Sequence, residues 1–208
     1  MDIRIANTKS RIINGLIELL STEKLDQCSV REIVEKSGVS KKTFYNLYKN
    51  KQDFISQLEN DILGEVEDAL EQDRKSLEGI EKRSIEEIAG YASFAFDHIL
   101  NYCDENSELI SALLSSNGDI TFSRQVVHIA RNEFGVRVPM LVGEIDNNIS
   151  ESDYFKIFTT IYVDNIIDVL RYWLNHKDTL SLENVKELLG TVQVKSPAMA
   201  MLDLVKEN

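Results

Sequence analysis

The sequence contains few of the residues that interrupt or cross-link a polypeptide chain. Its 208 residues include 2 prolines, 9 glycines and 2 cysteines. So few prolines and glycines argue against an all-β chain, whose many tight turns depend on both residues. Cys28 and Cys103 lie far apart and form no CxxC pair, so they provide no disulfide framework. This cysteine usage fits a reducing compartment, and we expect a cytoplasmic protein.

Long apolar runs are missing as well. No stretch approaches the roughly 20 apolar residues that a helix needs to span a bilayer. The first residues, Met-Asp-Ile-Arg-Ile-Ala-Asn, lack the apolar stretch of a signal peptide. We therefore expect neither a membrane span nor export. With 43% hydrophobic and 28% charged residues, the composition is that of a soluble globular protein that can bury a core.

Motifs that carry catalysis or metal binding are also missing. The three histidines, His98, His128 and His176, are not spaced four residues apart, and no HExxH occurs. The sequence contains no GxGxxG, no phosphate-binding loop and no GxSxG. We predict that the protein is not an enzyme and that it holds no metal and no cofactor.

The charge is divided unevenly along the chain. The formal net charge is −12, which by itself argues against nucleic acid as a partner. Residues 1–55, however, carry a net charge of +3, and the remaining residues carry −15. Because binding depends on local rather than total charge, a basic N-terminal part can approach phosphate while the acidic part points away.

Apolar residues recur at three- and four-residue spacings, which predicts an all-α chain of about nine helices. A first helix is expected at about 8–22. Ser29 and Glu32 have the capping-box spacing that opens a second, short helix. Gly38 then allows a tight reversal, Ser40 caps a third helix, and a long helix is expected at about 51–76.

Two short helices joined by a turn that contains glycine predict a helix-turn-helix motif. An ordinary helical hairpin has the same periodicity. The polar residues favour the DNA-binding motif, because the stretch from Ser40 to Gln52 has four lysines and no acidic residue. A merely solvated helix face would be expected to mix charges.

The run from Ser29 to Phe54 resembles the DNA-binding domain of TetR-family transcriptional regulators. The resemblance rests on Gly-Val-Ser-Lys-Lys-Thr-Phe-Tyr at 38–45 and on Tyr-Lys-Asn-Lys at 48–51. The rest of the chain resembles the family in its helical architecture and in Arg-Tyr-Trp-Leu at 171–174, followed by Leu-Ser-Leu-Glu at 180–183. The resemblance implies a helix-turn-helix domain at 1–50 and a ligand-binding and dimerisation domain at 51–208.

The implied function is sequence-specific regulation of transcription. We expect a homodimeric repressor that leaves a palindromic operator in double-stranded DNA when a small-molecule effector binds. The alternative is a TetR-like co-regulator that acts by protein contact without binding an operator. Lys42 stands where the family often has a small residue, so the operator sequence stays open.

The DNA site can be predicted residue by residue. The third helix would enter the major groove, where Lys can donate to guanine, a Thr methyl can meet a thymine methyl and Asn can pair with adenine. Lys42, Thr43 and Asn46 are the predicted base contacts. The predicted phosphate contacts are Ser29, Lys41, Tyr45, Tyr48 and Lys51. Ser40, the cap of this helix, completes the predicted DNA site.

The helix expected at about 153–176 is apolar on more than one face. One stripe comprises Phe155, Phe158, Tyr162, Ile166, Val169 and Trp173, and another comprises Val163, Ile167, Leu170 and Leu174. Either the helix is buried within one subunit, or one face covers the core and the other meets a partner. The resemblance favours a homodimer through this helix and the next, at about 182–189.

The effector pocket is harder to place. Aromatic residues, histidines and Pro139, which we expect to bend or end a helix, are gathered between residues 84 and 145. Such residues at helical spacing are more often core than ligand contacts. If a pocket exists, a small ligand needs an apolar cleft with a few polar groups. The predicted lining is Tyr91, Phe94, His98, Tyr102, Phe122, His128 and Tyr162.

Overall fold

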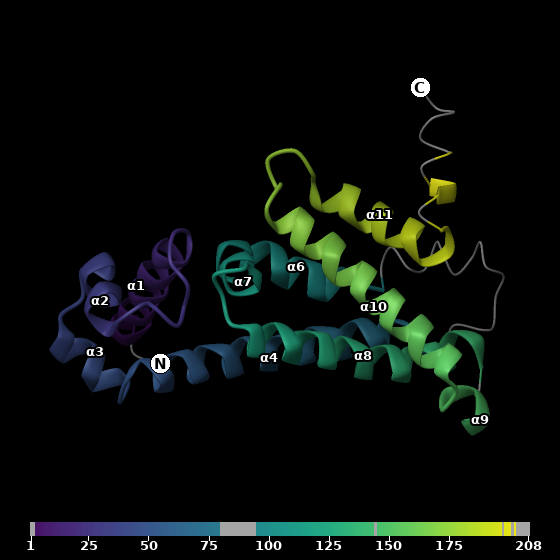
Figure 1. The fold of residues 1–208 in the computed structure, drawn as a ribbon, viewed down its shortest axis with the longest axis horizontal. Helices are drawn as coiled ribbons and strands as arrows, with labels where there is room; N and C mark the ends of the chain where they lie inside the picture. Colours follow the sequence, from purple (N-terminus) through teal and green to yellow (C-terminus); the bar gives the residue numbers. More distant parts are fainter. Residues whose placement is uncertain (1–2, 80–94, 144, 197, 201, 203–208) are drawn as a thin grey trace. The chain divides into compact units, whose positions relative to one another are not determined.

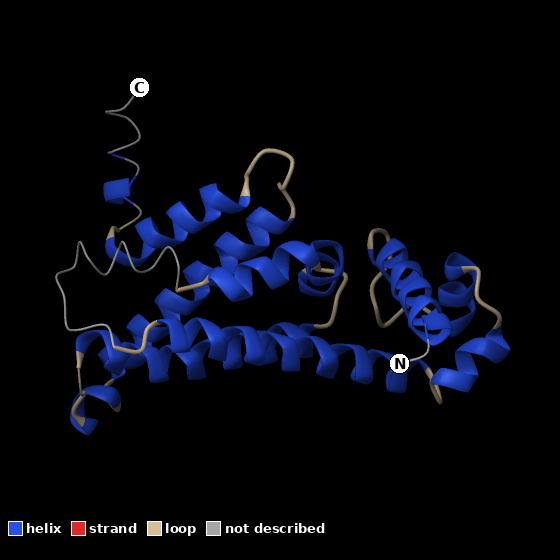
Figure 2. Cartoon of the chain, turned by 180° about the vertical axis from the view of Figure 1, so that it is seen from behind, coloured by secondary structure: helices blue, strands red, loops and turns tan. Residues whose placement is uncertain are grey.

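The computed structural model describes residues 3–79, 95–143, 145–196, 198–200 and 202 (Figure 1). Within these residues every regular element is a helix, which confirms the all-α prediction, and Figure 2 shows only helices and loops there. The helices are α1 (Ile3–Leu20), α2 (Val30–Ser37), α3 (Lys41–Leu47), α4 (Lys51–Ser76), α6 (Asp97–Glu105), α7 (Ser107–Leu114), α8 (Ile120–Val142), α9 (Asn147–Ser150), α10 (Asp153–Leu174) and α11 (Leu182–Val194).

The chain forms two compact units. The first, here called the head unit, comprises Met1–Glu65 and Asn106–Gln125, and the second, the body unit, comprises Val66–Glu105 and Val126–Asn208. Helices α4 and α8 each contribute residues to both units. The predicted functional division at residue 50 remains a prediction.

Apolar side chains from four helices and the start of α4 form the core of the head unit. Helix α1 packs on α2 and on α7. The close crossing of α1 and α2 depends on Gly15, because a Cβ atom there would lie 2.8 Å from the backbone nitrogen of Ser37. The most deeply buried side chains are Ile12, Leu16, Ile33, Phe44, Phe54 and Leu113.

A short loop after α7 is hydrogen-bonded to α1 and to the segment that follows α1. The Asn117 side chain donates to the carbonyl of Leu20, and the Asn117 carbonyl accepts from the backbone N–H of Leu25. The first bond ties the loop to the C-terminal end of α1, where helix carbonyls otherwise lack partners, and the second ties it to the segment between α1 and α2.

The body unit contains a buried polar network. Both carboxylate oxygens of Asp73 accept backbone N–H groups at the start of α6, from His98 and Ile99. Arg137 of α8 is buried as well and donates to Glu133 and to the carbonyls of Leu70 and Ala95. Every named group therefore has a partner, which makes the burial of these charges tolerable.

Helix α8 bears on the expectation that Pro139 bends or ends a helix, and helix α11 is longer than predicted. Helix α8 passes through Pro139 and ends at Val142, where Gly143 takes up a left-handed conformation with φ of 91°. Pro139 therefore does not end the helix, although it removes one backbone donor. Helix α11 runs to Val194 rather than to about 189, because Leu189 and Gly190 are buried and packing outweighs the poor helix propensity of glycine.

In the part of the chain that the structure describes, no helix combines the length and the apolar character needed to cross a membrane.

Candidate DNA-binding interface

Helix α2 begins at the predicted capping box. The Ser29 hydroxyl accepts the backbone N–H of Glu32, and the Glu32 carboxylate accepts the backbone N–H of Ser29 at 2.8 Å. The same carboxylate accepts the Ser29 hydroxyl at 2.6 Å, and these hydrogen bonds hold the pKa of Glu32 below its usual value. Four otherwise unpaired donors open a helix, so this reciprocal pair fixes where α2 starts.

The turn between α2 and α3 depends on a glycine. Gly38 ends α2 with φ of 61° and ψ of 24°, a left-handed conformation that side chains with a Cβ rarely adopt. One Arg11 nitrogen donates to the carbonyls of Ser37 and Gly38, at 3.0 and 2.8 Å. Arg11 thus joins α1 to the C-terminal end of α2, where a cation also complements the helix dipole.

Aromatic packing holds the buried side of helix α3. Phe44 is fully buried, and its ring centroid lies 5.4 Å from that of Tyr48 and 5.8 Å from that of Phe54. Ser40 caps the helix by accepting the backbone N–H of Thr43 at 3.1 Å, and the two hydroxyl oxygens lie 2.8 Å apart. Cap and core together fix which side chains face outward.

The outward face of α3 carries most of the predicted contacts. Lys41, Lys42, Tyr45 and Asn46 are exposed, and Thr43 is half-buried. The exposed ring of Tyr45 packs edge-on against Phe44, with the centroids 5.6 Å apart. Ser29 and Ser40 are exposed at the starts of α2 and α3. The structure therefore brings together on one motif the polar groups that the sequence indicated.

Two predicted phosphate contacts have other surroundings. Tyr48 is only 5% exposed, and burial raises the pKa of its hydroxyl. The ammonium group of Lys51 donates to the carbonyls of Leu25, Asp26 and Cys28. An ammonium has three protons, so these three acceptors use all of them. The sequence pattern could not reveal the Lys51 contacts, because they join segments that lie more than twenty residues apart.

Two models of known protein families match this chain. Residues 12–58 match the model described as bacterial regulatory proteins of the tetR family, and residues 91–193 match a transcriptional regulator C-terminal region. The chain belongs to the TetR family of transcriptional regulators. It is accordingly a DNA-binding transcriptional regulator, and family members generally act as transcription factors rather than enzymes.

Solved structures of other regulators share the fold. A TetR transcriptional regulator from Streptococcus agalactiae 2603V is 20% identical, with 93% of this chain and 97% of that chain covered and a TM-score of 0.54. The fatty acid degradation regulator FadR from Bacillus halodurans is 10% identical, with coverage of 91% and 96% and a TM-score of 0.59.

A TetR/AcrR-type regulator from Aquifex aeolicus VF5 is 18% identical, with coverage of 88% and 95% and a TM-score of 0.55. At these identities the likeness shows the fold alone. The comparison with curated proteins gives no match.

The residues predicted to line an effector pocket have varied surroundings. Tyr91 and Phe94 lie outside the described residues. His98 and His128 are exposed, and Tyr102 is half-buried. Phe122 is buried in the head unit, whereas the other described members belong to the body unit.

Tyr162 packs against the ring of Phe134, with centroids 4.5 Å apart, and burial raises the pKa of its hydroxyl to about 12. This pairing joins α10 to α8. None of the predicted lining residues that the structure describes borders the groove between α10 and α11, so the effector site stays a prediction.

Helix α10 of this TetR-family chain is apolar on two sides, and the structure separates them. Its inner side is buried and includes Val163, Ile166, Ile167, Trp173 and Leu174. Its outer side exposes Tyr154, Ile157, Phe158, Ile161 and Tyr172. The predicted stripes do not match these sides. Phe158 and Trp173 share one predicted stripe, but Phe158 is exposed, while Trp173 is fully buried and donates its indole N–H to the carbonyl of Leu180.

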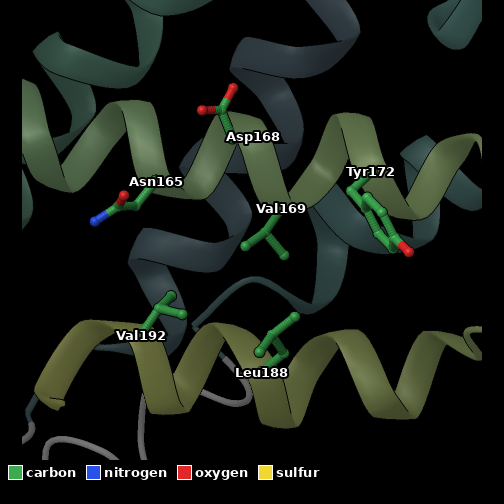
Figure 3. Close-up of a pocket in the computed structure, with 6 residues that line it drawn as sticks. All are labelled: Asn165, Asp168, Val169, Tyr172, Leu188 and Val192. Atoms are coloured by element: carbon green, nitrogen blue, oxygen red, sulfur yellow. The ribbon is translucent and has the colours of Figure 1, made fainter. Parts of the chain in front are cut away.

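A shallow groove lies between α10 and α11. Its volume is about 250 Å³, and Figure 3 shows Val169 and Tyr172 of α10 opposite Leu188 and Val192 of α11. Asn165 and Asp168 complete the lining from the α10 side. The exposed outer side of α10, extended by Leu188, forms a surface that we call the α10–α11 face.

Proposed function

We propose that this TetR-family regulator is a homodimeric repressor that binds a palindromic operator through α3 and leaves it when a small-molecule effector binds. The observation that carries the proposal is the outward face of α3, where Lys41, Lys42, Tyr45 and Asn46 surround a buried Phe44. A rigidly anchored helix with exposed basic and amide groups is suited to reading a major groove.

The proposed contacts divide into two kinds. Lys42, Thr43 and Asn46 would read base edges, and Thr43 would offer its methyl group because its hydroxyl is bound to Ser40. Ser29, Lys41 and Tyr45 would bind phosphates and so set the register of the protein on the duplex. We do not include Tyr48 and Lys51 among the proposed phosphate contacts, because Tyr48 is buried and the Lys51 ammonium donates to three backbone carbonyls.

The α10–α11 face supports a second copy of the chain as the partner. Phe158 is 65% exposed, and Tyr154 and Tyr172 are exposed to similar or greater extents. Large apolar side chains that are exposed on one side of a helix mark an interaction site rather than a solvated face. A two-fold dimer would present two reading helices to half-sites about 34–36 Å apart.

Effector control would act as a shift between populations of the dimer. An effector that prefers one spacing of the two reading helices weakens binding to DNA by the same coupling free energy. In this proposal residues 1–50 bind DNA and residues 51–208 provide the effector and dimer surfaces. The predicted aromatic and histidine residues remain the candidates for the effector site.

Selection of binding sites from random duplex DNA tests the operator proposal. We expect enrichment of a palindrome at moderate salt. On that site Tyr45→Phe should weaken all sequences alike, whereas Lys42→Ala should change the preference at one base position by about 1–3 kcal/mol. A folded dimer that enriches no sequence would refute operator binding and favour the co-regulator alternative.

Sedimentation of a charged variant tests the dimer surface. Leu188→Glu places a carboxylate in the groove between α10 and α11, so we expect a folded monomer. Val136→Glu is the matched control, because Val136 is exposed on α8 and is not part of the α10–α11 face. A dimer that persists in Leu188→Glu would show that this face is not the interface.

A further inference from the structure

A lysine at the start of α4 is bound entirely by backbone oxygens. The Lys51 ammonium lies 2.9 Å from the carbonyl of Leu25, 3.2 Å from that of Asp26 and 2.7 Å from that of Cys28. Its side chain is half-buried rather than extended into solvent. Charged donors form the stronger hydrogen bonds of proteins, so the three contacts hold one segment firmly.

The segment held by Lys51 leads directly into α2. Its backbone turns at Lys24, whose carbonyl accepts the N–H groups of Gln27 and Cys28. The residue after Cys28 is Ser29, which caps α2. Lys51 therefore fixes the first turn of α2 against the first turn of α4.

The other end of α2 is held in the same manner. One nitrogen of Arg11, on α1, donates to the carbonyls of Ser37 and Gly38. Gly38 is the turn residue that sends the chain into α3. A cation from a neighbouring helix thus binds backbone carbonyls in the segment just before α2, and another binds those at its C-terminal end, so that the direction of α3 depends on both.

We propose that Lys51 and Arg11 are positioning residues for DNA recognition: they bind the backbone at the two ends of α2 and set the orientation of α3, and they do not bind phosphate. This inference rests on the proposed operator binding by α3. It assigns two basic residues of the head unit to the support of the reading helix rather than to its contact surface.

Lysine and arginine differ in a way that tests the role of Lys51. Three carbonyls arranged around one nitrogen suit a compact ammonium, whereas the planar guanidinium of arginine presents its donors in a fixed fork. A phosphate contact accepts either residue, and arginine binds phosphate well. Lys51→Arg should therefore fail as a replacement if Lys51 positions the motif, and should succeed if Lys51 binds phosphate.

The experiment measures the affinity of the full-length protein for its selected DNA site over a series of salt concentrations. We expect Lys51→Met and Lys51→Arg each to lose about tenfold or more in specific affinity. The slope of log affinity against log salt should stay equal to that of the unaltered protein, because no phosphate contact is lost. Non-specific affinity should change by less than about twofold, a difference that simple loss of folded protein would not produce.

The matched control is Lys49→Met. Lys49 is exposed two residues earlier, so this variant loses the same charge without touching the three carbonyls. Arg11→Met tests the other end of α2 and keeps the proposal testable if both Lys51 variants fail to fold. We expect Arg11→Met to lose specific affinity with an unchanged salt slope, as for Lys51→Met.

Hydrogen exchange of the DNA-free protein separates this inference from the proposed function. Lys51→Met should speed exchange of the amides at 27–33, and Lys49→Met should not. Equal exchange in the two variants would refute the positioning role, whereas failure of the unaltered protein to select any site would refute operator binding. A shallower salt slope by about 0.9 per lost contact, with affinity retained in Lys51→Arg, would show that Lys51 binds phosphate.

Discussion

Glu59 of the head unit is a buried acidic residue whose carboxyl has a raised pKa. It lies on α4 and is only 8% exposed, and its Oε1 atom has no hydrogen-bond partner within the described residues. Burial, helped by the negative charge of Asp119, raises the pKa of its carboxyl from 4.5 to about 7. We predict that Glu59→Gln makes the protein more stable at pH 8 than the unaltered chain.

The magnitude follows from the difference between the two pKa values. Each pKa unit corresponds to about 1.4 kcal/mol, so a carboxyl that titrates near 7 instead of 4.5 costs the folded state roughly 3 kcal/mol when ionised. Relaxation of the surroundings lowers this figure, and we expect a gain of about 1–3 kcal/mol in the free energy of unfolding.

The sign of the pH dependence is also determined. The folded state binds the Glu59 proton more tightly than the unfolded state, so this group favours folding at low pH. Its contribution to stability is lost as the pH rises from about 4.5 to about 7 and stays constant above that range. Any fixed cost of burying the Gln amide shifts the whole curve without changing its pH dependence.

The assay is urea denaturation followed by circular dichroism between pH 5 and pH 8. The difference in stability between Glu59→Gln and the unaltered protein should grow through this range. Glu67→Gln is the control, because Glu67 is an exposed carboxylate on the same helix. A difference that does not vary with pH, or one that varies equally in Glu67→Gln, would refute the reasoning.

Three further outcomes are expected. Gly118→Ala places a Cβ atom 2.0 Å from the carbonyl oxygen of Leu113 and should lower the free energy of unfolding by about 3 kcal/mol or more. Gly64→Ala meets open space within α4 and should raise the free energy of unfolding by about 0.5–1 kcal/mol. Urea denaturation of both variants measures this contrast. Ser29→Ala removes the capping box and should cost about 1 kcal/mol in the same assay, with Ser29→Thr close to the unaltered protein. Cys103 is buried and the pKa of its thiol is raised to about 12, so a disulfide reagent at pH 8 should label it only after unfolding; labelling of the folded protein would contradict its burial.

The parts of the fold that depend on local interactions could be predicted from the sequence. The capping box at Ser29, the reversal at Gly38 and the cap at Ser40 involve residues no more than four positions apart, and all are confirmed. The long helix predicted at 51–76 is also confirmed. The first helix begins at Ile3, earlier than predicted. The apolar stripe could not indicate this start, because the initial residues are mostly exposed and do not belong to the stripe.

Periodicity could not tell which apolar residues of α10 meet the core. Helical spacing groups residues by angle around the axis, and a helix that is apolar on two sides has no unique inner face. The predicted stripe therefore groups Trp173 with Phe158, although packing buries the first and exposes the second. Only the tertiary structure shows which side of α10 the neighbouring helices bury, and therefore which side stays exposed and supports a dimer.

The sequence by itself determined the helical class, the helix-turn-helix motif and the basic character of the reading helix. These properties follow from residue type and from spacings of a few residues, which act before any distant contact forms. The tertiary structure decided which polar groups remain available. Lys41 and Lys51 are the same residue type in one basic stretch, yet Lys41 is exposed on α3 while Lys51 binds three carbonyls from a segment more than twenty residues away. Only the path of the backbone in space brings those acceptors to one ammonium and not to the other.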